Sequence, residues 1–177
     1  GTDAVVHIRT DAHGRMDVRE LERMCAEMQA DAAHPQGVPL IVCATSGTTV
    51  LGAFDDVAAI AEVCRKYDLW LHVDASWGGA AAFLPHDAPA RSVIAGLENA
   101  HSITINPHKL LGVTHQCSFL LVHDKSVLIP PSHSDGGYLF HVPAEDALDM
   151  ATKTLGCGRR GDALKFYLVW LRCGTQG

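Results

Sequence analysis

The chain of 177 residues is 47% hydrophobic and 19% charged, which is the composition of an ordinary globular protein with enough apolar material for one sizeable core. Its formal net charge of −6 argues against a basic surface that would bind nucleic acid or an anionic membrane. The longest apolar stretches, such as residues 40–47 and 118–122, have the length of a strand and are too short to span a bilayer. We therefore expect neither nucleic acid nor a membrane as a partner.

The cysteines and histidines bear on compartment and metal binding. Six cysteines are spread along the chain without a CxxC pair, and several lie inside apolar runs. Cysteines used as small core residues are typical of a reducing compartment, so we expect a cytoplasmic location. His101, His108 and His115 recur every seven residues, but Pro107 and Gly112 between them prevent one continuous helical face. We expect no metal site.

The first predicted element is an amphipathic helix over residues 16–28. Asp17 followed by Glu20 resembles a capping box at its start. Its apolar residues follow the spacing i, i+3, i+4 and i+7 that places them on one face. This stripe consists of Leu21, Met24, Cys25 and Met28.

Short apolar runs next in the chain predict strands. They cover residues 39–46, 69–76, 101–107 and 116–124. A second amphipathic helix is predicted over residues 54–68, with Asp55 or Asp56 as its N-cap. Continuous apolar strands alternating with a helix indicate an α/β fold, with a mostly parallel sheet and helices on both faces.

The last third of the chain differs in composition. Residues 129–146 are rich in Pro, Gly and Ser around a few aromatic residues, which predicts a long functional or mobile loop. A final amphipathic helix is predicted over residues 161–173, directly before the last four residues. A chain that starts at a strand and stops after such a helix is expected to be part of a longer protein.

Polar residues follow three successive predicted strands. Gly47, Thr48 and Thr49 follow the first strand, Asp74 lies at the end of the second, and Lys109 follows the third. Alone, the glycine and threonines fit a structural turn, Asp74 fits a turn or an N-cap, and Lys109 fits a surface lysine. Together they would meet at the carboxyl edge of the sheet, where open α/β sheets bind ligands.

Lys109 is the most informative of these residues. A charged amine is costly near an apolar strand, because desolvation disfavours the ammonium form. An amine that condenses with an aldehyde avoids this cost, and a carboxylate beside a cofactor's ring nitrogen makes that ring an electron sink. We therefore interpret Lys109 as the Schiff-base lysine of a pyridoxal 5'-phosphate site, with Asp74 as the carboxylate.

Six motifs also resemble the group II pyridoxal-phosphate decarboxylases, with glutamate decarboxylase and cysteine sulfinate decarboxylase the most similar. These motifs are GTTVLGAFD, LWLHVDASWGG, NPHKLLG, QCS, YLF and CGRRGDALK. The resemblance implies the type I aminotransferase-like fold. It places residues 1–177 in the central and later part of the large cofactor-binding domain, without the N-terminal segment and the C-terminal small domain. It also implies a homodimer with the active site at the subunit interface.

The resemblance assigns most cofactor contacts to the strand ends. Lys109 would be the Schiff-base lysine, and Asp74 would pair with the pyridinium nitrogen. Asn106 and His108 would lie close to the phosphate, although His108 could instead only orient the lysine. Thr49 would contact the ring hydroxyl or the substrate carboxylate.

Further roles follow from the same resemblance. His72, on the same strand face as Asp74, would support its carboxylate. Ser76 replaces the alanine that many members place against the ring, and it adds a hydroxyl there. Tyr138, in the loop 129–146, would donate a proton to Cα of the substrate while the loop closes over the neighbouring subunit's site.

The function implied is decarboxylation of an acidic amino acid to the amine and carbon dioxide. Glutamate, cysteine sulfinate and aspartate all remain open as substrates, because residues 145–156 depart from the acidic-Thr-Gly-Asp stretch typical of the animal glutamate enzymes. Two alternatives also remain. One is another enzyme of the same fold, an aminotransferase or a carbon–sulfur lyase. The other is a non-catalytic fragment, and we expect this chain alone to be inactive.

Overall fold

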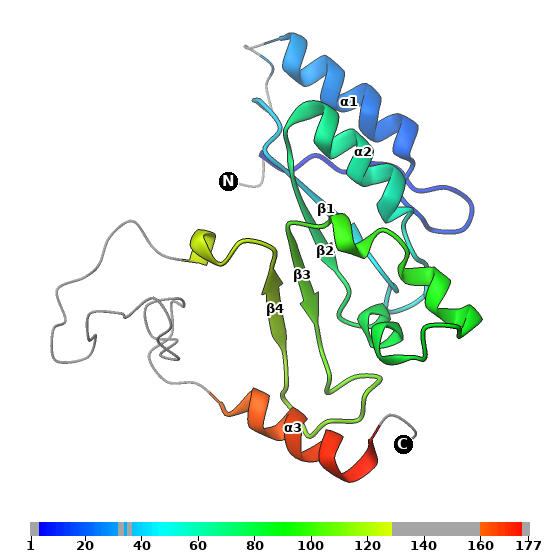
Figure 1. Ribbon diagram of the computed structural model, residues 1–177. Helices are drawn as coiled ribbons and strands as arrows, with labels where there is room; N and C mark the ends of the chain where they lie inside the picture. The colour runs from blue at the N-terminus through cyan, green and yellow to red at the C-terminus, as the bar shows by residue number, and fades with distance from the viewer. Residues whose placement is uncertain (1–3, 32–33, 35–36, 129–159, 175–177) are drawn as a thin grey trace, which may run out of the picture.

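The sheet is the centre of the fold in this computed structural model, which describes residues 4–31, 34, 37–128 and 160–174. The predicted loop 129–146 lies outside the described residues. The strands are β1 (Ile41–Thr45), β2 (Trp70–Asp74), β3 (Ser102–Ile105) and β4 (Phe119–Val122), and they lie side by side in this order (Figure 1). β1, β2 and β3 run parallel, whereas β4 is antiparallel to β3. The prediction of a mostly parallel sheet is confirmed.

The helices agree with the sequence pattern to within three residues at each end. They are α1 (Val18–Ala30), α2 (Val57–Tyr67) and α3 (Asp162–Cys173). Short 3-10 helices, which the sequence pattern did not indicate, also occur in the described part of the chain. They are η2 (Gly78–Phe83), η3 (Pro89–Ile94), η4 (Leu97–Asn99) and η5 (Lys125–Leu128).

The hydrophobic core lies between α2 and one face of the sheet. Ile60 of α2, together with Leu71 and Val73 of β2, is completely buried there. α1 lies beside α2 and adds its own apolar stripe to the same core (Figure 1). On the opposite face Ile41 is 55% exposed, so no helix among the described residues covers this end of β1.

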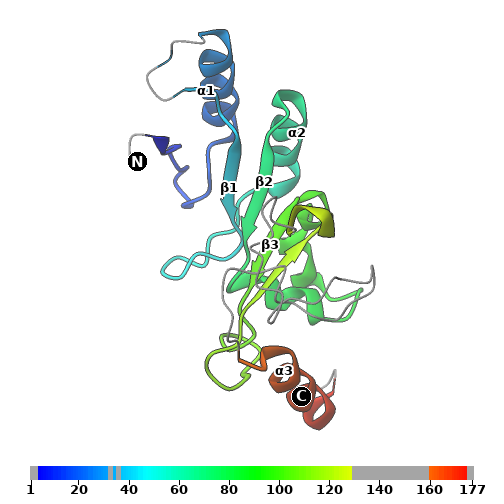
Figure 2. The same ribbon diagram turned by 90° about the vertical axis from the view of Figure 1, so that its left-hand side faces the viewer.

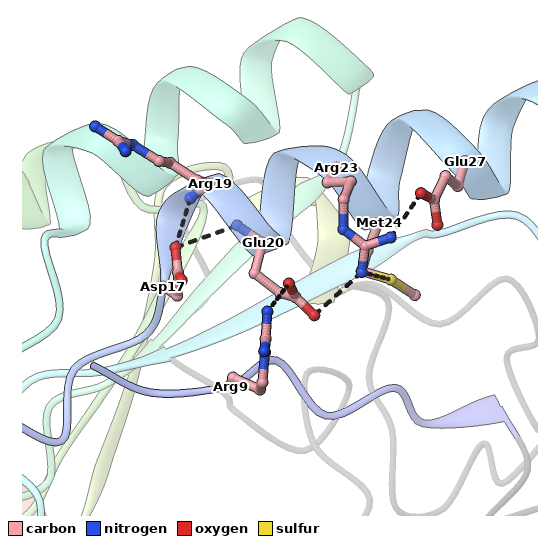
Figure 3. A network of polar contacts seen from close by, with 7 residues as sticks. All are labelled: Arg9, Asp17, Arg19, Glu20, Arg23, Met24 and Glu27. Atoms are coloured by element: carbon pink, nitrogen blue, oxygen red, sulfur yellow. Dashed lines mark hydrogen bonds and ion pairs between the residues drawn. The ribbon is translucent and has the colours of Figure 1, made fainter. Parts of the chain in front are cut away.

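The start of α1 shows how the preceding segment is attached. The Asp17 carboxylate caps the helix by accepting the N–H groups of Arg19 and Glu20, at 3.0 and 3.2 Å. Glu20 does not complete a capping box, because its carboxylate binds Arg9 and Arg23 instead (Figure 3). The hydrogen bond from Arg9, and then that from Arg23, holds the pKa of Glu20 below its usual value. This network ties the N-terminal segment to the helix.

The two aspartates before α2 have different tasks. Asp56 is the N-cap, and its carboxylate accepts the N–H of Ala59 at 3.0 Å. Asp55 instead accepts the N–H groups of Thr45 and Met16, at 2.7 and 2.6 Å. Asp55 therefore joins the end of β1 to the segment before α1, which fixes the turn after β1 at the carboxyl edge of the sheet.

α3 lies beyond the end of the sheet at which β3 ends and β4 begins (Figure 1). The Asp162 carboxylate at its start accepts the N–H of Ser118 at 3.1 Å. Phe166 packs against Phe83 and Phe119, with ring centroids 5.6 and 5.8 Å apart. In the part of the chain that the structure describes, no helix has the length and apolar character needed to cross a membrane.

Candidate active site

The backbone brings the ends of the three parallel strands together. After β1, the N–H of Ser46 donates to the carbonyl of Asp74 at 2.8 Å. After β3, the N–H of Asn106 faces the carbonyl of Ser76 at 3.4 Å. The turns after β1, β2 and β3 therefore meet at one edge, as the strand order predicts for parallel strands.

Asp74 offers an ionised carboxylate at this edge. Its Oδ1 accepts the N–H of Ser76 at 3.0 Å. Partial burial raises the pKa of Asp74, but hydrogen bonds from the Ser76 hydroxyl and N–H, together with the charge of Lys109, outweigh burial and hold the pKa below its usual value. Asp74 is therefore negatively charged at neutral pH, as a partner for a protonated ring nitrogen must be.

Lys109 lies in the turn after β3, on the same edge. Its N–H donates to the carbonyl of Asn106 at 2.9 Å, which forms the turn. Its half-buried side chain places Nζ 5.1 Å from the centroid of the Trp77 ring, a cation–π distance. The charge of Lys109 is also one of the causes that hold the pKa of Asp74 low, as expected for two residues on the same edge.

Two glycines allow the turns after β1 and β2 to approach closely. A Cβ at Gly78 would lie 2.4 Å from the carbonyl oxygen of Ser46, whose position is fixed by the N–H of Gly78 at 2.9 Å. Gly47 has a φ of +88°, and a Cβ there would lie 2.8 Å from the nitrogen of Gly78. The glycines of the two motifs thus serve backbone packing, and sequence reasoning gave no role to Gly78 or Trp77.

His72 is held by the neighbouring strand. Its Nδ1 lies 2.8 Å from the Oγ of Ser102, and its Nε2 lies 3.4 Å from the Oγ1 of Thr104. The Asp74 carboxylate, two residues further along β2, takes its hydrogen bonds from Ser76. The hydrogen bonds seen for this ring do not reach the Asp74 carboxylate, so support of Asp74 by His72 stays a prediction.

His108 is turned towards the segment before β4. Its Nδ1 lies 2.6 Å from the carbonyl oxygen and 3.1 Å from the nitrogen of Cys117. Its ring also packs edge to face on His115, with centroids 4.4 Å apart. These contacts attach the turn of Lys109 to the segment before β4, and the orienting role and the phosphate contact of His108 both stay predictions.

Some of the remaining predicted residues lie at or near this edge, and one lies outside the residues that the structure describes. Asn106 lies at the edge beside Lys109, and Ser76 lies beside Asp74. Thr49 is exposed in the turn after β1, which extends away from the strands (Figure 2). Tyr138 lies outside the described residues.

Several buried polar atoms at this edge have no hydrogen-bond partner among the described residues. They are Ser46 Oγ, Trp77 Nε1 and Asn106 Oδ1. A buried polar group without a partner costs free energy, so native proteins rarely leave one unpaired. Two hollows near His101 lie elsewhere and are lined by none of the predicted site residues. The unpaired atoms and the Lys109–Asp74 arrangement both fit a polar ring and its phosphate at the carboxyl edge.

A half-buried lysine and an ionised aspartate at the carboxyl edge of an α/β sheet are typical of enzymes that hold an aldehyde cofactor on a lysine. The conserved domain of the pyridoxal-dependent decarboxylases matches residues 4–177. The chain therefore belongs to the pyridoxal-dependent decarboxylase family. This confirms the predicted family and its cofactor.

Curated relatives match along the whole chain. Cysteine sulfinic acid decarboxylase of Homo sapiens is 45% identical over 180 residues. L-aspartate decarboxylase dtxS4 of Metarhizium robertsii is 43% identical over 178 residues, and acidic amino acid decarboxylase GADL1 of Mus musculus is 44% identical over 180 residues. Each alignment covers 100% of this chain but only 35%, 34% and 32% of these relatives, respectively. The chain thus spans about a third of their length.

Solved structures support the same fold. The crystal structure of mouse CSAD matches with a TM-score of 0.84 and 44% identity, over 100% of this chain and 35% of that chain. The structure of Oryza sativa TDC with PLP and tryptamine matches with a TM-score of 0.78 and 33% identity, over 92% of this chain and 32% of that chain. The predicted fold class is confirmed.

Proposed function

We propose that the natural protein catalyses the pyridoxal-phosphate-dependent decarboxylation of an acidic amino acid to the amine and carbon dioxide. The observation that carries the proposal is the common edge of Lys109 and Asp74, where the turns after β3 and β2 meet through the backbone contact of Asn106 with Ser76. The relatives named for cysteine sulfinic acid, aspartate and acidic amino acids favour a substrate with a second acidic group.

Pyridoxal phosphate supplies an aldehyde that condenses with amines and a ring that withdraws electrons from the substrate's Cα. Lys109 would hold the cofactor's aldehyde through Nζ, which lies 5.1 Å from the centroid of the Trp77 ring. Asp74 would hold a proton on the ring nitrogen, because its carboxylate is already ionised and oriented by Ser76.

Other residues at the edge would orient the ligand rather than carry charge. Asn106 Oδ1 is buried without a partner among the described residues, so it could accept a hydrogen bond from a ligand group. His108 would fix the turn of Lys109 through Cys117. Thr49, exposed in the turn after β1, is the candidate for a contact with the ring hydroxyl or the substrate carboxylate.

Tyr138 is proposed as the proton donor to Cα after carbon dioxide leaves, because a phenol is protonated at neutral pH and can donate. Tyr138→Phe keeps the ring and removes only the hydroxyl. We expect amine formation to slow by about 10²-fold, with a larger share of carbonyl product. The measurement is the ratio of amine to carbonyl product. A variant that releases amine as fast and as cleanly as the parent would assign the proton to another group.

The substrate test uses the natural full-length protein supplied with pyridoxal phosphate. Carbon dioxide release is measured with cysteine sulfinate, glutamate and aspartate, and with tryptophan as a substrate that lacks an acidic side chain. We expect release with at least one acidic substrate and much less with tryptophan. Amino-group transfer or carbon–sulfur cleavage without carbon dioxide would instead identify another enzyme of this fold. A protein that binds no cofactor would support the non-catalytic alternative.

We also propose a homodimer in the cytoplasm. The face of α3 that carries Leu164, Tyr167, Leu168 and Leu171 is exposed, and such apolar patches are typical of surfaces that pack against another part of an assembly. Because the 177-residue chain spans about a third of its relatives' length, we expect it alone to bind the cofactor weakly and to show no turnover. Sedimentation of the full-length protein tests the dimer, and a soluble, active monomer of the 177-residue chain would contradict it.

A further inference from the structure

A series of hydrogen bonds links the side chains of β2 and β3 on the sheet face opposite α2. The Trp70 indole Nε1–H donates to Ser102 Oγ at 2.9 Å. The same oxygen lies 2.8 Å from His72 Nδ1, and His72 Nε2 lies 3.4 Å from Thr104 Oγ1. Ser102 is only 6% exposed, so water does not readily replace these contacts.

The chemistry of these groups determines which is the donor and which is the acceptor in each hydrogen bond. An indole nitrogen can only donate, so Ser102 Oγ must accept from Trp70. The Ser102 proton then finds its acceptor at His72 Nδ1, because a buried hydroxyl that donates to nothing would be costly. His72 Nδ1 is therefore the acceptor nitrogen of a neutral ring, and the ring proton is on Nε2.

This tautomer affects the end of β2. Thr104, which faces Nε2, is the strand partner of Asp74, so Nε2 is the ring nitrogen on the Asp74 side of the histidine. A donor N–H near a carboxylate favours its ionised form, whereas an acceptor lone pair disfavours it. The opposite tautomer would turn a lone pair towards the edge that has to stay negative.

We propose that Ser102 is a positioning residue, which fixes His72 as the Nε2–H tautomer and thereby supports the charge of Asp74 at the cofactor edge. The inference rests on the proposed function for its consequence, but its first step concerns only residues of β2 and β3. Trp70 takes part by donating its indole N–H to Ser102 Oγ, which makes this oxygen the acceptor of that hydrogen bond. Ser102 and Trp70 were not among the residues that sequence reasoning assigned to the site.

The test uses the natural full-length protein labelled with ¹⁵N-histidine, and His72→Gln assigns the His72 signals. In the parent we expect an unprotonated Nδ1 and a protonated Nε2. Ser102→Ala should shift both signals towards an average of the two tautomers, and Ser102→Thr, which keeps the hydroxyl, should restore them. Trp70→Phe should give an intermediate shift. Ser92→Ala is the matched control, because the Ser92 hydroxyl only donates to the Pro89 carbonyl on the surface.

A second measurement links the tautomer to the site. Titration of the apoenzyme with pyridoxal phosphate, followed by absorbance, should give an affinity on the order of fivefold weaker for Ser102→Ala, the effect of about one hydrogen bond. Ser102→Thr should bind as the parent does. Unchanged His72 signals and affinity in Ser102→Ala, with a parent that binds the cofactor, would overturn the inference and leave the proposed function standing. The expected His72 signals in a parent that binds no cofactor would support the tautomer step and refute the proposed function.

Discussion

The face of the sheet under α2 and the carboxyl edge of the same strands are built from adjacent residues. They differ in whether their buried groups find partners within the described part of the chain. Under α2, Leu71 and Val73 are completely buried among apolar side chains. At the edge, Trp77 Nε1 and Asn106 Oδ1 are buried without a partner among the described residues. The core is therefore packed without a ligand, whereas the carboxyl edge leaves polar groups that a ligand could bind. This difference distinguishes the scaffold from the site.

The largest effect is expected in the core, from Leu71→Ala. Removing this buried side chain leaves a cavity that the packed helix α2 cannot fill, so the free energy of unfolding should fall by about 2–5 kcal/mol. Leu120→Ala is the matched control, because Leu120 of β4 is 56% exposed in the structure. Denaturant unfolding of the full-length protein measures both. Equal losses would mean that the two faces of the sheet do not differ as described.

Asp74→Asn changes the edge and leaves the core intact. The amide keeps the size of the side chain but removes the charge that would hold a proton on the ring nitrogen. We expect a loss on the order of 10²-fold or more in kcat, comparable to the removal of other preorganised electrostatic groups. Unfolding should change little, because the side chain is accessible to solvent. A variant as active as the parent would make Asp74 a turn residue only.

Much of the scaffold could be predicted because it depends on local patterns. Asp17 caps α1 and Asp56 caps α2, as the spacing of acidic and apolar residues indicates. The antiparallel direction of β4 could not be predicted in this way, because it depends on where the chain returns after Lys109 rather than on the composition of the strand.

The residue types at the carboxyl edge could be predicted from the sequence. The side chains that these residues contact could be predicted less well. Lys109 and Asp74 follow strands, so parallel topology alone brings them together. The partners of His72 come from β3, and they depend on the register that pairs His72 with Ser102. Register is set by the whole sheet, and no short motif reports it. The contact of Lys109 with Trp77 likewise depends on how two loops fold against each other.

A smaller effect is expected far from both regions, at Glu20. The arginines that bind Glu20 lower its pKa, so the stabilisation is present at neutral pH and is lost as pH falls through the folded-state pKa. Glu20→Gln should therefore be slightly less stable than the parent near pH 7, and the two should converge only once the pH falls below the folded-state pKa of Glu20, which lies under the ordinary carboxyl value of about 4.3. Thermal unfolding between pH 3 and 7 measures this. A constant difference across that range would mean that the charge of Glu20 contributes nothing.

The most direct test of the site is the identity of the lysine that holds the cofactor. Natural full-length protein loaded with pyridoxal phosphate is reduced with borohydride, digested, and mapped by mass spectrometry. We expect the reduced cofactor on the peptide that contains Asn106 to Gly112, attached to Lys109, and no label in Lys109→Ala. Labelling of Lys66, Lys125, Lys153 or Lys165 in place of Lys109 would contradict the assignment of the carboxyl edge as the cofactor site.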